Sequence, residues 1–347
     1  YFRGTMTKMK SFWDKLPQPF FALAPMEAVT DVVFRHVVQR AGAPDVFFTE
    51  FANATGWVHA GDKAIAGRLL KTGDEHPLVA QIWGGEPGDM EQFAAHCARL
   101  GFDGIDINMG CPAKSAIKSG GAALIRRPDV AVAAIHAAKT AGLPVSVKTR
   151  LGYTHVNEWR EWLQILLEQN IVNLTIHLRT KKEMSKVPAH YELIDDIVTL
   201  RDAVAPHTLL TINGDIRDRE HGLALASEYP GVNGIMIGRG VFANPFCFAA
   251  NDTRYLHSQN SLEQNETIST NNDSAVIRCT ELFDLLNYHL DLFDRYQPQT
   301  GRPFETLKRF FKIYIKGFDG AKELRDQLMH TASTDEVRQT LHTHSTT

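Results

Sequence analysis

The sequence is poor in the features that mark secreted, membrane and metal-binding proteins. It has only four cysteines in 347 residues, which argues against a disulfide framework and favours a reduced, intracellular protein. No apolar run approaches the roughly 20 residues of a membrane span, and no segment near the start resembles a signal peptide. No Cys or His ligand spacing is present, so we expect no metal ion. These absences predict a cytoplasmic protein.

The chain also lacks a strong charge of either sign. Its 37 Lys and Arg residues nearly balance 40 Asp and Glu residues, for a net charge of -3. Taken alone, this balance argues against a nucleic-acid partner. With 44% apolar residues, the chain can bury an ample core, and its length suggests about two domains. Residues 1–5 resemble a protease-site and cloning remnant, so they carry no weight in predicting the fold.

Eight short apolar segments, rich in β-branched residues, alternate with helix-like segments. Their starts recur every 25 to 41 residues, which is the spacing of βα units. Such alternation implies a parallel sheet, and eight units predict an α/β fold, a (β/α)8 TIM barrel. An open doubly wound sheet is the main alternative, but it would need a glycine-rich turn after the first strand, where Ala24-Pro25-Met26-Glu27 stands. The predicted strands lie at 20–24, 46–49, 78–82, 104–107, 145–149, 174–177, 209–212 and 234–237.

The pattern changes beyond the barrel, which we assign to residues 6–250. Residues 251–274 are rich in Ser, Asn, Gln and Thr and predict a linker or mobile loop. Residues 275–347 have apolar residues at helical spacing, most regularly at 281–293 and 304–315. The sequence therefore predicts a small C-terminal all-α helical domain after the barrel.

Polar residues end nearly every predicted strand. In a TIM barrel the active site lies at the carboxyl ends of the strands, so these are the candidate site residues. The loops after strands seven and eight commonly build a phosphate site, although tight turns would have the same composition. The strand-end residues are Pro25, Met26, Glu27, Glu50, Gln81, Asn108, Cys111, Lys148, Arg150, His177, Arg179, Asn213, Gly214, Asp215, Gly238 and Arg239.

Some strand-end side chains suggest specific chemistry. Lys148 ends a buried strand, so its charge needs compensation, which a flavin edge, a Schiff base or a plain ion pair would provide. Cys111 stands between glycine and proline in a loop, where a mostly protonated thiol can act as a general acid. His177 and Arg179 share one face of a strand, so both could reach the pocket.

Six motifs resemble the tRNA-dihydrouridine synthase family. Their order and spacing match along about residues 20–248, and Asn-Met-Gly-Cys-Pro is the most specific of them, while residues 307–325 resemble that family's helical domain. The motifs are Ala24-Pro-Met-Glu-Ala-Val-Thr-Asp31, Asp106-Ile-Asn-Met-Gly-Cys-Pro-Ala-Lys114, Ser146-Val-Lys-Thr-Arg150, Ile176-His-Leu-Arg-Thr180, Ile212-Asn-Gly-Asp215 and Met236-Ile-Gly-Arg239.

The resemblance implies an FMN-dependent oxidoreductase that uses NADPH to reduce the C5–C6 double bond of particular uridines in tRNA. It implies that Cys111 is the catalytic proton donor, and that Asn108 and Arg179 lie near the substrate. We expect a monomer that binds tRNA partly through Lys308 and Lys312. The residues that the resemblance assigns to FMN are Pro25, Met26, Glu27, Gln81, Lys148, His177, Asn213, Gly214, Asp215, Gly238 and Arg239.

Two positions depart from the family pattern. Leu178 stands where the family usually has a glycine between His and Arg, and this could alter the pocket. Phe310 and Phe311 follow a basic pair where the family often has a histidine, and this could alter RNA docking.

Three other functions remain open at this point. A dihydroorotate dehydrogenase is also an FMN barrel that acts on a pyrimidine C5–C6 bond, but it needs no helical appendage. A class I aldolase would use Lys148 as a Schiff base. A flavin-bound RNA-binding protein without catalytic activity would keep the motifs as relics.

The near-neutral total charge conceals opposing segments. Residues 111–150 hold seven basic residues against one acidic, residues 302–316 hold five against one, and residues 251–300 hold three against eight. Lys308 and Lys312 recur at helical spacing, which predicts one basic face that contacts phosphates. A solvated helix face is the alternative interpretation.

Overall fold

The computed structural model describes residues 11–65, 67–250 and 271–345. Its parallel sheet runs in the order β1-β9-β8-β7-β6-β5-β4-β2. A bridge between Ala22 and Val46 joins β1 to β2 and closes the sheet into a barrel, which confirms the predicted TIM barrel. The strands are β1 (Phe20–Leu23), β2 (Phe47–Phe48), β4 (Leu78–Trp83), β5 (Gly104–Asn108), β6 (Val145–Arg150), β7 (Asn173–His177), β8 (Leu209–Asn213) and β9 (Gly234–Ile237).

One further strand, β3 (Ala52–Asn53), pairs with β4 beyond the end of β2. The sequence did not predict it, because two residues are too few to show an alternating pattern. It belongs to no separate βα unit, so barrel strands seven and eight are β8 and β9.

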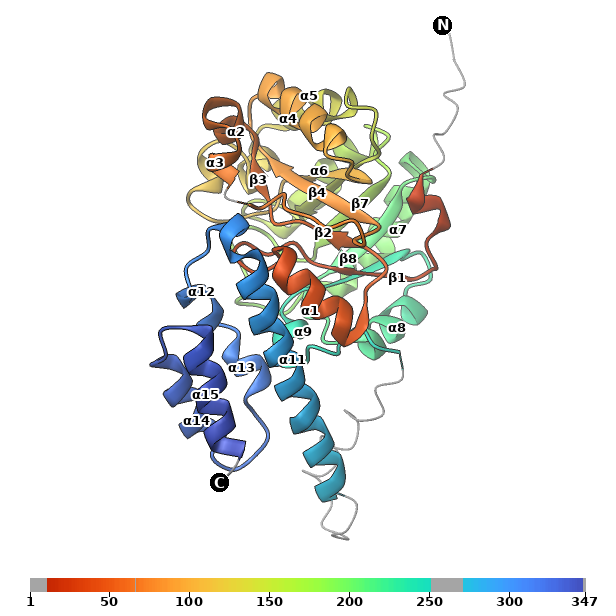
Figure 1. Ribbon diagram of the computed structural model, residues 1–347. Helices are drawn as coiled ribbons and strands as arrows, with labels where there is room; N and C mark the ends of the chain where they lie inside the picture. Colours follow the sequence, from red (N-terminus) through yellow and green to blue (C-terminus); the bar gives the residue numbers. More distant parts are fainter. Residues whose placement is uncertain (1–10, 66, 251–270, 346–347) are drawn as a thin grey trace, which may run out of the picture.

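Helices surround the barrel (Figure 1). Their starts follow local chemistry, since Asp31 Oδ1 accepts a hydrogen bond from Phe34 N (3.0 Å) at the start of α1, and prolines open α4 and α5. The α-helices are α1 (Val32–Gly42), α2 (Ala54–Ala60), α3 (Asp62–Ile65), α4 (Pro87–Arg99), α5 (Pro128–Lys139), α6 (Trp159–Leu167), α7 (Ile194–Val204), α8 (Arg219–Glu228) and α9 (Gly240–Ala243). Short 3-10 helices lie at Phe12–Lys15, Ala116–Lys118, Gly121–Arg126, Val156–Glu158 and Tyr191–Leu193.

Strand alternation divides the barrel into an outer and an inner core. Phe21 and Leu23 of β1 pack in the large cluster shared with the surrounding helices. Phe20 and Ala22 belong to a second cluster inside the barrel, where Trp13 lies 5.7 Å from the ring of Phe20. This apolar cluster shares the barrel interior with buried polar residues such as Asn173 and Thr211, which hydrogen-bond to each other (2.7 Å).

The C-terminal helices lie along one side of the barrel, with α11 beside α1 (Figure 1). The guanidinium of Arg40 lies 4.4 Å from the ring of Tyr288, and Phe34 stacks on Phe310 at 4.9 Å. The helices are α11 (Asn271–Thr300), α12 (Glu305–Lys308), α13 (Phe311–Tyr314), α14 (Ala321–Met329) and α15 (Thr334–Ser345).

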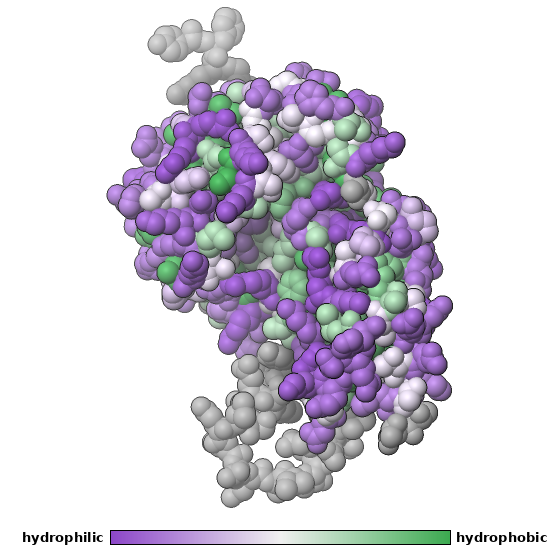
Figure 2. Space-filling model, turned by 90° about the vertical axis from the view of Figure 1, so that its left-hand side faces the viewer, coloured by the Kyte–Doolittle hydropathy of each residue, from purple (hydrophilic) through white to green (hydrophobic). Residues whose placement is uncertain are grey.

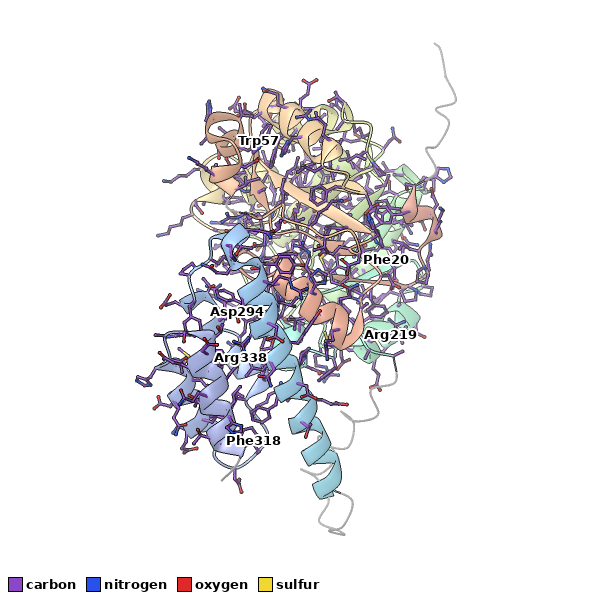
Figure 3. The ribbon with its side chains drawn as sticks, in the orientation of Figure 1. Phe20, Trp57, Arg219, Asp294, Phe318 and Arg338 are labelled. Carbon is purple, nitrogen blue, oxygen red and sulfur yellow. The ribbon has the colours of Figure 1, made fainter. Side chains whose placement is uncertain are left out.

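Ion pairs tie these helices to each other and to the barrel. Arg338 of α15 reaches Asp294 of α11 at 2.8 Å (Figure 3). Arg302, in the segment after α11, pairs with Glu50 after β2 and lies 3.1 Å from Asp31 at the start of α1. Glu50 is fully buried, and this burial raises its pKa to about 7. Arg302 therefore joins the two parts of the molecule through a buried contact.

The C-terminal predictions have mixed outcomes. Helices follow the barrel as expected, and residues 304–315, where the helical spacing is regular, contain two four-residue helices, α12 and α13, joined through Arg309 and Phe310. Residues 1–5 and most of the predicted linker lie outside the described residues, and α11 begins within the linker's last residues. Among the described helices, none is long and apolar enough to span a membrane.

Candidate active site

A cavity of about 610 Å³ opens at the carboxyl ends of the strands. This volume lies within the roughly 300–1,000 Å³ of pockets that bind small molecules and cofactors. Figure 2 shows a side of the molecule that is mostly hydrophilic and is hollowed near its centre. The predicted site residues that line the cavity are Pro25, Met26, Asn108, Cys111, Lys148, His177, Asn213, Gly214, Asp215, Gly238 and Arg239.

Strand register brings these side chains to one level. Asn108 pairs with Lys148 across β5 and β6, and His177 pairs with Asn213 across β7 and β8. In a parallel barrel, partners in register point to the same side of the sheet. Residues that lie far apart in the sequence therefore line one wall because each stands at the same height on its strand.

Lys148 lies at the base of the cavity. Its ammonium donates a hydrogen bond to Asn213 Oδ1 (3.0 Å), and Asn213 Nδ2 donates to the carbonyl of Met236 (2.8 Å). Burial, followed by the charge of Arg150, lowers the pKa of Lys148 to about 7. In the part of the chain that the structure describes, no carboxylate oxygen lies within 4.0 Å of the ammonium. Lys148 therefore keeps donor capacity for an anionic or carbonyl group in the cavity.

Asn108 holds the loop that carries Cys111. Its Oδ1 accepts hydrogen bonds from the amides of Gly110 (3.1 Å) and Cys111 (2.9 Å). Burial raises the pKa of the Cys111 thiol, so it carries its proton at neutral pH. A Cβ on Gly121 would come within 2.9 Å of the Cys111 carbonyl, and this glycine has φ +55°. The loop thus presents a protonated thiol to the cavity from a fixed backbone.

A buried polar chain supports Asn108 from below. Its Nδ2 donates to Gln81 Oε1 (3.0 Å), and Gln81 Nε2 donates to Asp106 (2.7 Å). Ser146 donates to the other oxygen of Asp106 (2.6 Å). Burial raises the pKa of Asp106 to about 6. These contacts fix both the rotamer and the orientation of the Asn108 amide.

His177 and Arg179 act as a pair at the end of β7. The guanidinium of Arg179 donates to His177 Nε2 (3.1 Å) and pairs with Asp215. An arginine can only donate, so Nε2 is the unprotonated nitrogen and Nδ1 carries the proton. Burial and the nearby cations, of which Arg150 contributes most, hold the pKa of His177 far below its usual value. The histidine is therefore a neutral hydrogen-bonding group.

The turns after β8 and β9 form the other end of the cavity. Gly214 has φ +127°, and a Cβ there would come within 3.1 Å of the His177 ring. Asp215 follows in a left-handed conformation with φ +54° and pairs with Arg239 at 3.1 Å. The Arg239 side chain is 66% exposed, so a solvated cation borders this end. Loops at this position commonly bind phosphate in TIM barrels.

Comparison with known proteins identifies the family. Residues 22–347 match the family model described as dihydrouridine synthase. The chain belongs to the dihydrouridine synthase family. It is 56% identical over 331 residues to "Probable tRNA-dihydrouridine synthase 2" of Bacillus subtilis (strain 168), covering 95% of each chain. It is 52% identical over 331 residues to "Probable tRNA-dihydrouridine synthase" of Staphylococcus aureus (strain MRSA252), covering 95% of this chain and 94% of the relative.

The family predicted from the six motifs is therefore confirmed. Dihydrouridine synthases are flavin-dependent oxidoreductases, so the chain is an enzyme of that class. Membership of this family excludes the aldolase and dihydroorotate dehydrogenase interpretations.

The cavity residues fit a flavin. Lys148 is a buried donor that suits the ring edge that becomes negative on reduction, and Arg239 is an exposed cation that suits a phosphate. Pro25 and Met26 line the same cavity. One cavity thus offers a donor for the ring and a cation for a phosphate tail.

Four of the predicted strand-end residues do not line the cavity. Glu50 is fully buried and pairs with Arg302. Glu27 pairs with Arg68 at 2.5 Å, Gln81 is buried beneath Asn108, and Arg179 lies behind His177 and Asp215. Gln81 and Arg179 act on the cavity through the residues that they orient. The resemblance alone could not separate wall residues from the residues that support them.

The cavity wall also includes residues to which the sequence assigned no role in binding. Arg150 was predicted only as a strand-end candidate; its guanidinium donates to the Gly110 carbonyl (2.8 Å). Arg217, Asp218 and Asn244 follow strands seven and eight in loops that the same rule covers. The additional lining residues are Ala24, Phe51, Gly110, Pro112, Thr149, Arg150, Ser185, Ile216, Arg217, Asp218, Gly240, Ala243 and Asn244.

The two departures from the family pattern lie outside the cavity wall. Leu178 is fully buried in the outer core, and its amide donates to the carbonyl of Asn213 (2.9 Å). Phe310 forms a three-ring cluster with Phe34 and Phe242 at the junction of the barrel and the C-terminal helices. Both side chains act in packing.

Lys308 and Lys312 lie on different short helices. Lys308 Nζ donates to the carbonyl of Met329 (3.0 Å), whereas Lys312 Nζ lies 5.8 Å from the ring centre of Phe242 in α9. The two ammonium groups therefore make separate contacts. Lys312 lies nearer to the cavity, because Ala243, the last residue of α9, lines it.

Proposed function

We propose that this protein is a tRNA-dihydrouridine synthase that uses FMN and NADPH to reduce the C5–C6 double bond of particular uridines in tRNA. The observation that carries the proposal is one cavity with a buried ammonium, a protonated thiol and a cationic end, in a chain of this family. The chemistry that reduced FMN supplies when bound is hydride transfer to C6 of the uracil.

Lys148, His177, Asn213 and Arg239 would hold the flavin. The ammonium of Lys148 would stabilise negative charge on the reduced ring edge, because Lys148 is removed from water. His177 would contribute a neutral N–H donor, and Arg239 with Gly214 would bind the phosphate. These roles follow from the charge, burial and hydrogen bonds of each residue.

Cys111 would donate the proton that C5 requires. A thiol with a raised pKa keeps its proton until charge develops on the substrate, which suits a general acid. Asn108 fixes the loop backbone at Cys111, so the thiol can approach the uracil face opposite the flavin. The remaining thiolate is then stabilised by the cations of Arg150 and Lys148.

The substrate base must leave its stack to reach the cavity, which costs a few kcal/mol. Basic residues around the mouth would offset this cost by binding phosphates. Lys312 beside α9 is a candidate from the C-terminal helices.

Cys111→Ala tests the proposal directly. We expect the variant to bind flavin and to be reduced by NADPH at the wild-type rate, whereas oxidation of the reduced flavin by unmodified tRNA slows by about 10²–10⁴-fold, the usual contribution of a general acid. Stopped-flow absorbance separates the two half-reactions. Cys97→Ala is the matched control, since Cys97 is buried in α4 away from the cavity.

Two results would count against the proposal. Wild-type turnover of tRNA by Cys111→Ala would exclude Cys111 as the proton donor. Absence of NADPH-dependent dihydrouridine in tRNA treated with wild-type enzyme would instead favour a flavin-bound RNA-binding protein without catalytic activity.

A further inference from the structure

The loop at residues 181–188 carries exposed apolar side chains at the rim of the cavity. Met184 is 42% exposed and Val187 is 36% exposed, and Ser185 between them lines the cavity. Only three other large apolar side chains are exposed to this degree among the described residues, namely Leu100, Leu223 and Met329. Two of the five therefore lie within four residues of one another beside the active site, where exposed apolar groups usually mark a binding surface.

Hydrogen bonds from buried groups hold this loop in shape. Arg150 Nη1, from the cavity wall, donates to the carbonyls of Met184 (2.9 Å) and Thr180 (3.1 Å). Arg179 Nε donates to the carbonyl of Val187 (2.6 Å), and Glu183 accepts from the amide of Thr180 (2.7 Å). The exposed position of Met184 is thus fixed by the same arginines that support the site.

Met184 itself has a left-handed backbone with φ +59°. A residue with a long side chain adopts this conformation only at an energetic cost, so its surroundings must enforce it. Here the cost keeps an apolar side chain in solvent, which gives the free protein no packing benefit. Strain of this kind points to a role in the bound state.

The same loop is basic. Lys181, Lys182 and Lys186 surround Met184 in the sequence, and Lys181 lies 4.9 Å from the ring centre of Tyr153. Arg126 lies over the same ring at 3.9 Å. An apolar group among cations suits a nucleic acid, because phosphates pair with the cations and a base face packs on the apolar group.

We propose that Met184 is a wedge that packs against the base next to the target uridine and holds the target out of its stack. The proposal rests on the proposed function, since the occupant is the substrate tRNA. Extruding the uridine exposes the face of its neighbour, and an apolar side chain that covers this face compensates for the broken stacking. Val187 extends the apolar surface, and the lysines hold the flanking phosphates.

Met184→Ala tests this role, with Leu100→Ala as the matched control and Met184→Leu as the conservative variant. Leu100 is 41% exposed and follows α4 at the opposite end of the barrel. The substrate is tRNA with 2-aminopurine beside the uridine that wild-type enzyme modifies, located first by mapping dihydrouridine. The 2-aminopurine fluorescence with oxidised enzyme reports unstacking without turnover, and the oxidation of reduced flavin by tRNA reports chemistry.

We expect wild-type enzyme, Leu100→Ala and Met184→Leu to raise the fluorescence on binding, and Met184→Ala to give a much smaller rise. Oxidation of its flavin at saturating tRNA should slow about tenfold, within the range expected when one side chain no longer stacks on a base, while tRNA affinity and reduction by NADPH change less than twofold. A wild-type fluorescence rise and oxidation rate in Met184→Ala would overturn the wedge while leaving the proposed function intact. If wild-type enzyme forms no dihydrouridine in tRNA, the proposed function fails first and the wedge fails with it.

Discussion

The barrel mouth and the C-terminal helices each carry lysines that the sequence predicts to contact a ligand. The structure shows that these lysines differ in burial and in hydrogen-bond partners. Lys148 lies buried at the base of the cavity, level with Asn108 and bonded to Asn213. Lys308 and Lys312 lie on two short helices and make unrelated contacts. In a parallel sheet, the register between neighbouring strands brings their end residues to the same level. On a helix, residues four positions apart share a face only if the helix is regular between them.

The largest effect is expected from Arg302→Met, because Arg302 joins the barrel to the C-terminal helices. Removing one partner of a buried ion pair costs about 3–5 kcal/mol, so we expect a decrease of this size in the free energy of unfolding at pH 8. The decrease should be smaller at pH 5, because Glu50, with its pKa raised to about 7, is then neutral in the folded state. Denaturant unfolding at both pH values measures it.

A matched control is Arg338→Met, whose ion pairs lie within the C-terminal helices and are partly exposed. It should cost only about 0–1 kcal/mol. The double variant Arg302→Met with Glu50→Gln should recover part of the stability at pH 8. If Arg302→Met and Arg338→Met lower the free energy of unfolding equally, the buried contact between the barrel and the C-terminal helices contributes no more than a partly exposed ion pair.

Lys148→Met tests how the buried lysine of the barrel contributes to cofactor binding. We expect affinity for FMN to fall at least about tenfold, since a hydrogen bond to a charged group contributes about 1.5–3 kcal/mol. Wild-type affinity should also weaken as the pH rises through about 7, where Lys148 loses its proton. Titration of apoprotein with FMN from pH 6 to 8 measures both effects, and the variant controls for titration of the phosphate.

Stability of the apoprotein should change in the opposite direction. The folded pKa of Lys148 lies below its ordinary value of 10.5, so its burial destabilises the folded state fully below pH 7, and this penalty fades as the pH rises towards 10.5. Lys148→Met should therefore stabilise the apoprotein most at pH 6. Equal unfolding free energies of the two apoproteins at pH 6 would contradict the burial of a charged lysine.

The smallest effects are expected in the C-terminal helices. Lys312→Glu should weaken tRNA binding several-fold and lower the slope of log affinity against log salt by about 0.7 to 0.9 for each phosphate that the variant no longer binds. Lys308→Glu should have a weaker effect, because Lys308 bonds to Met329. Filter binding at several salt concentrations compares them with Lys322→Glu, an exposed control in α14. Equal effects of all three would indicate only general electrostatics.

Much of the barrel could be predicted because its signals are local. The strand predicted at 234–237 matches β9, and the other strands differ from prediction by only a few residues at their ends. The rule that strand ends build the site reached Lys148, Asn213 and Arg239 on the cavity wall. β3 escaped prediction because its two residues owe their conformation to pairing with β4.

The division of roles around the cavity could not be predicted in the same way. Gln81 and Asn108 were both predicted at strand ends, yet only Asn108 reaches the cavity, because Gln81 stands two residues lower in the register and bonds to it from beneath. Ser185 lies on the wall because two arginines fold its loop inward, and no local pattern marks such a contact.

By itself the sequence determined the alternation of strands and helices, the family motifs and the set of strand-end side chains, because each depends on residues close together in the chain. The tertiary structure decided which side chains face the cavity, the raised pKa of Cys111, the lowered pKa of Lys148 and the different contacts of Lys308 and Lys312. These properties depend on burial and on partners from distant segments, such as Arg302 and Glu50, which only the folded chain brings together.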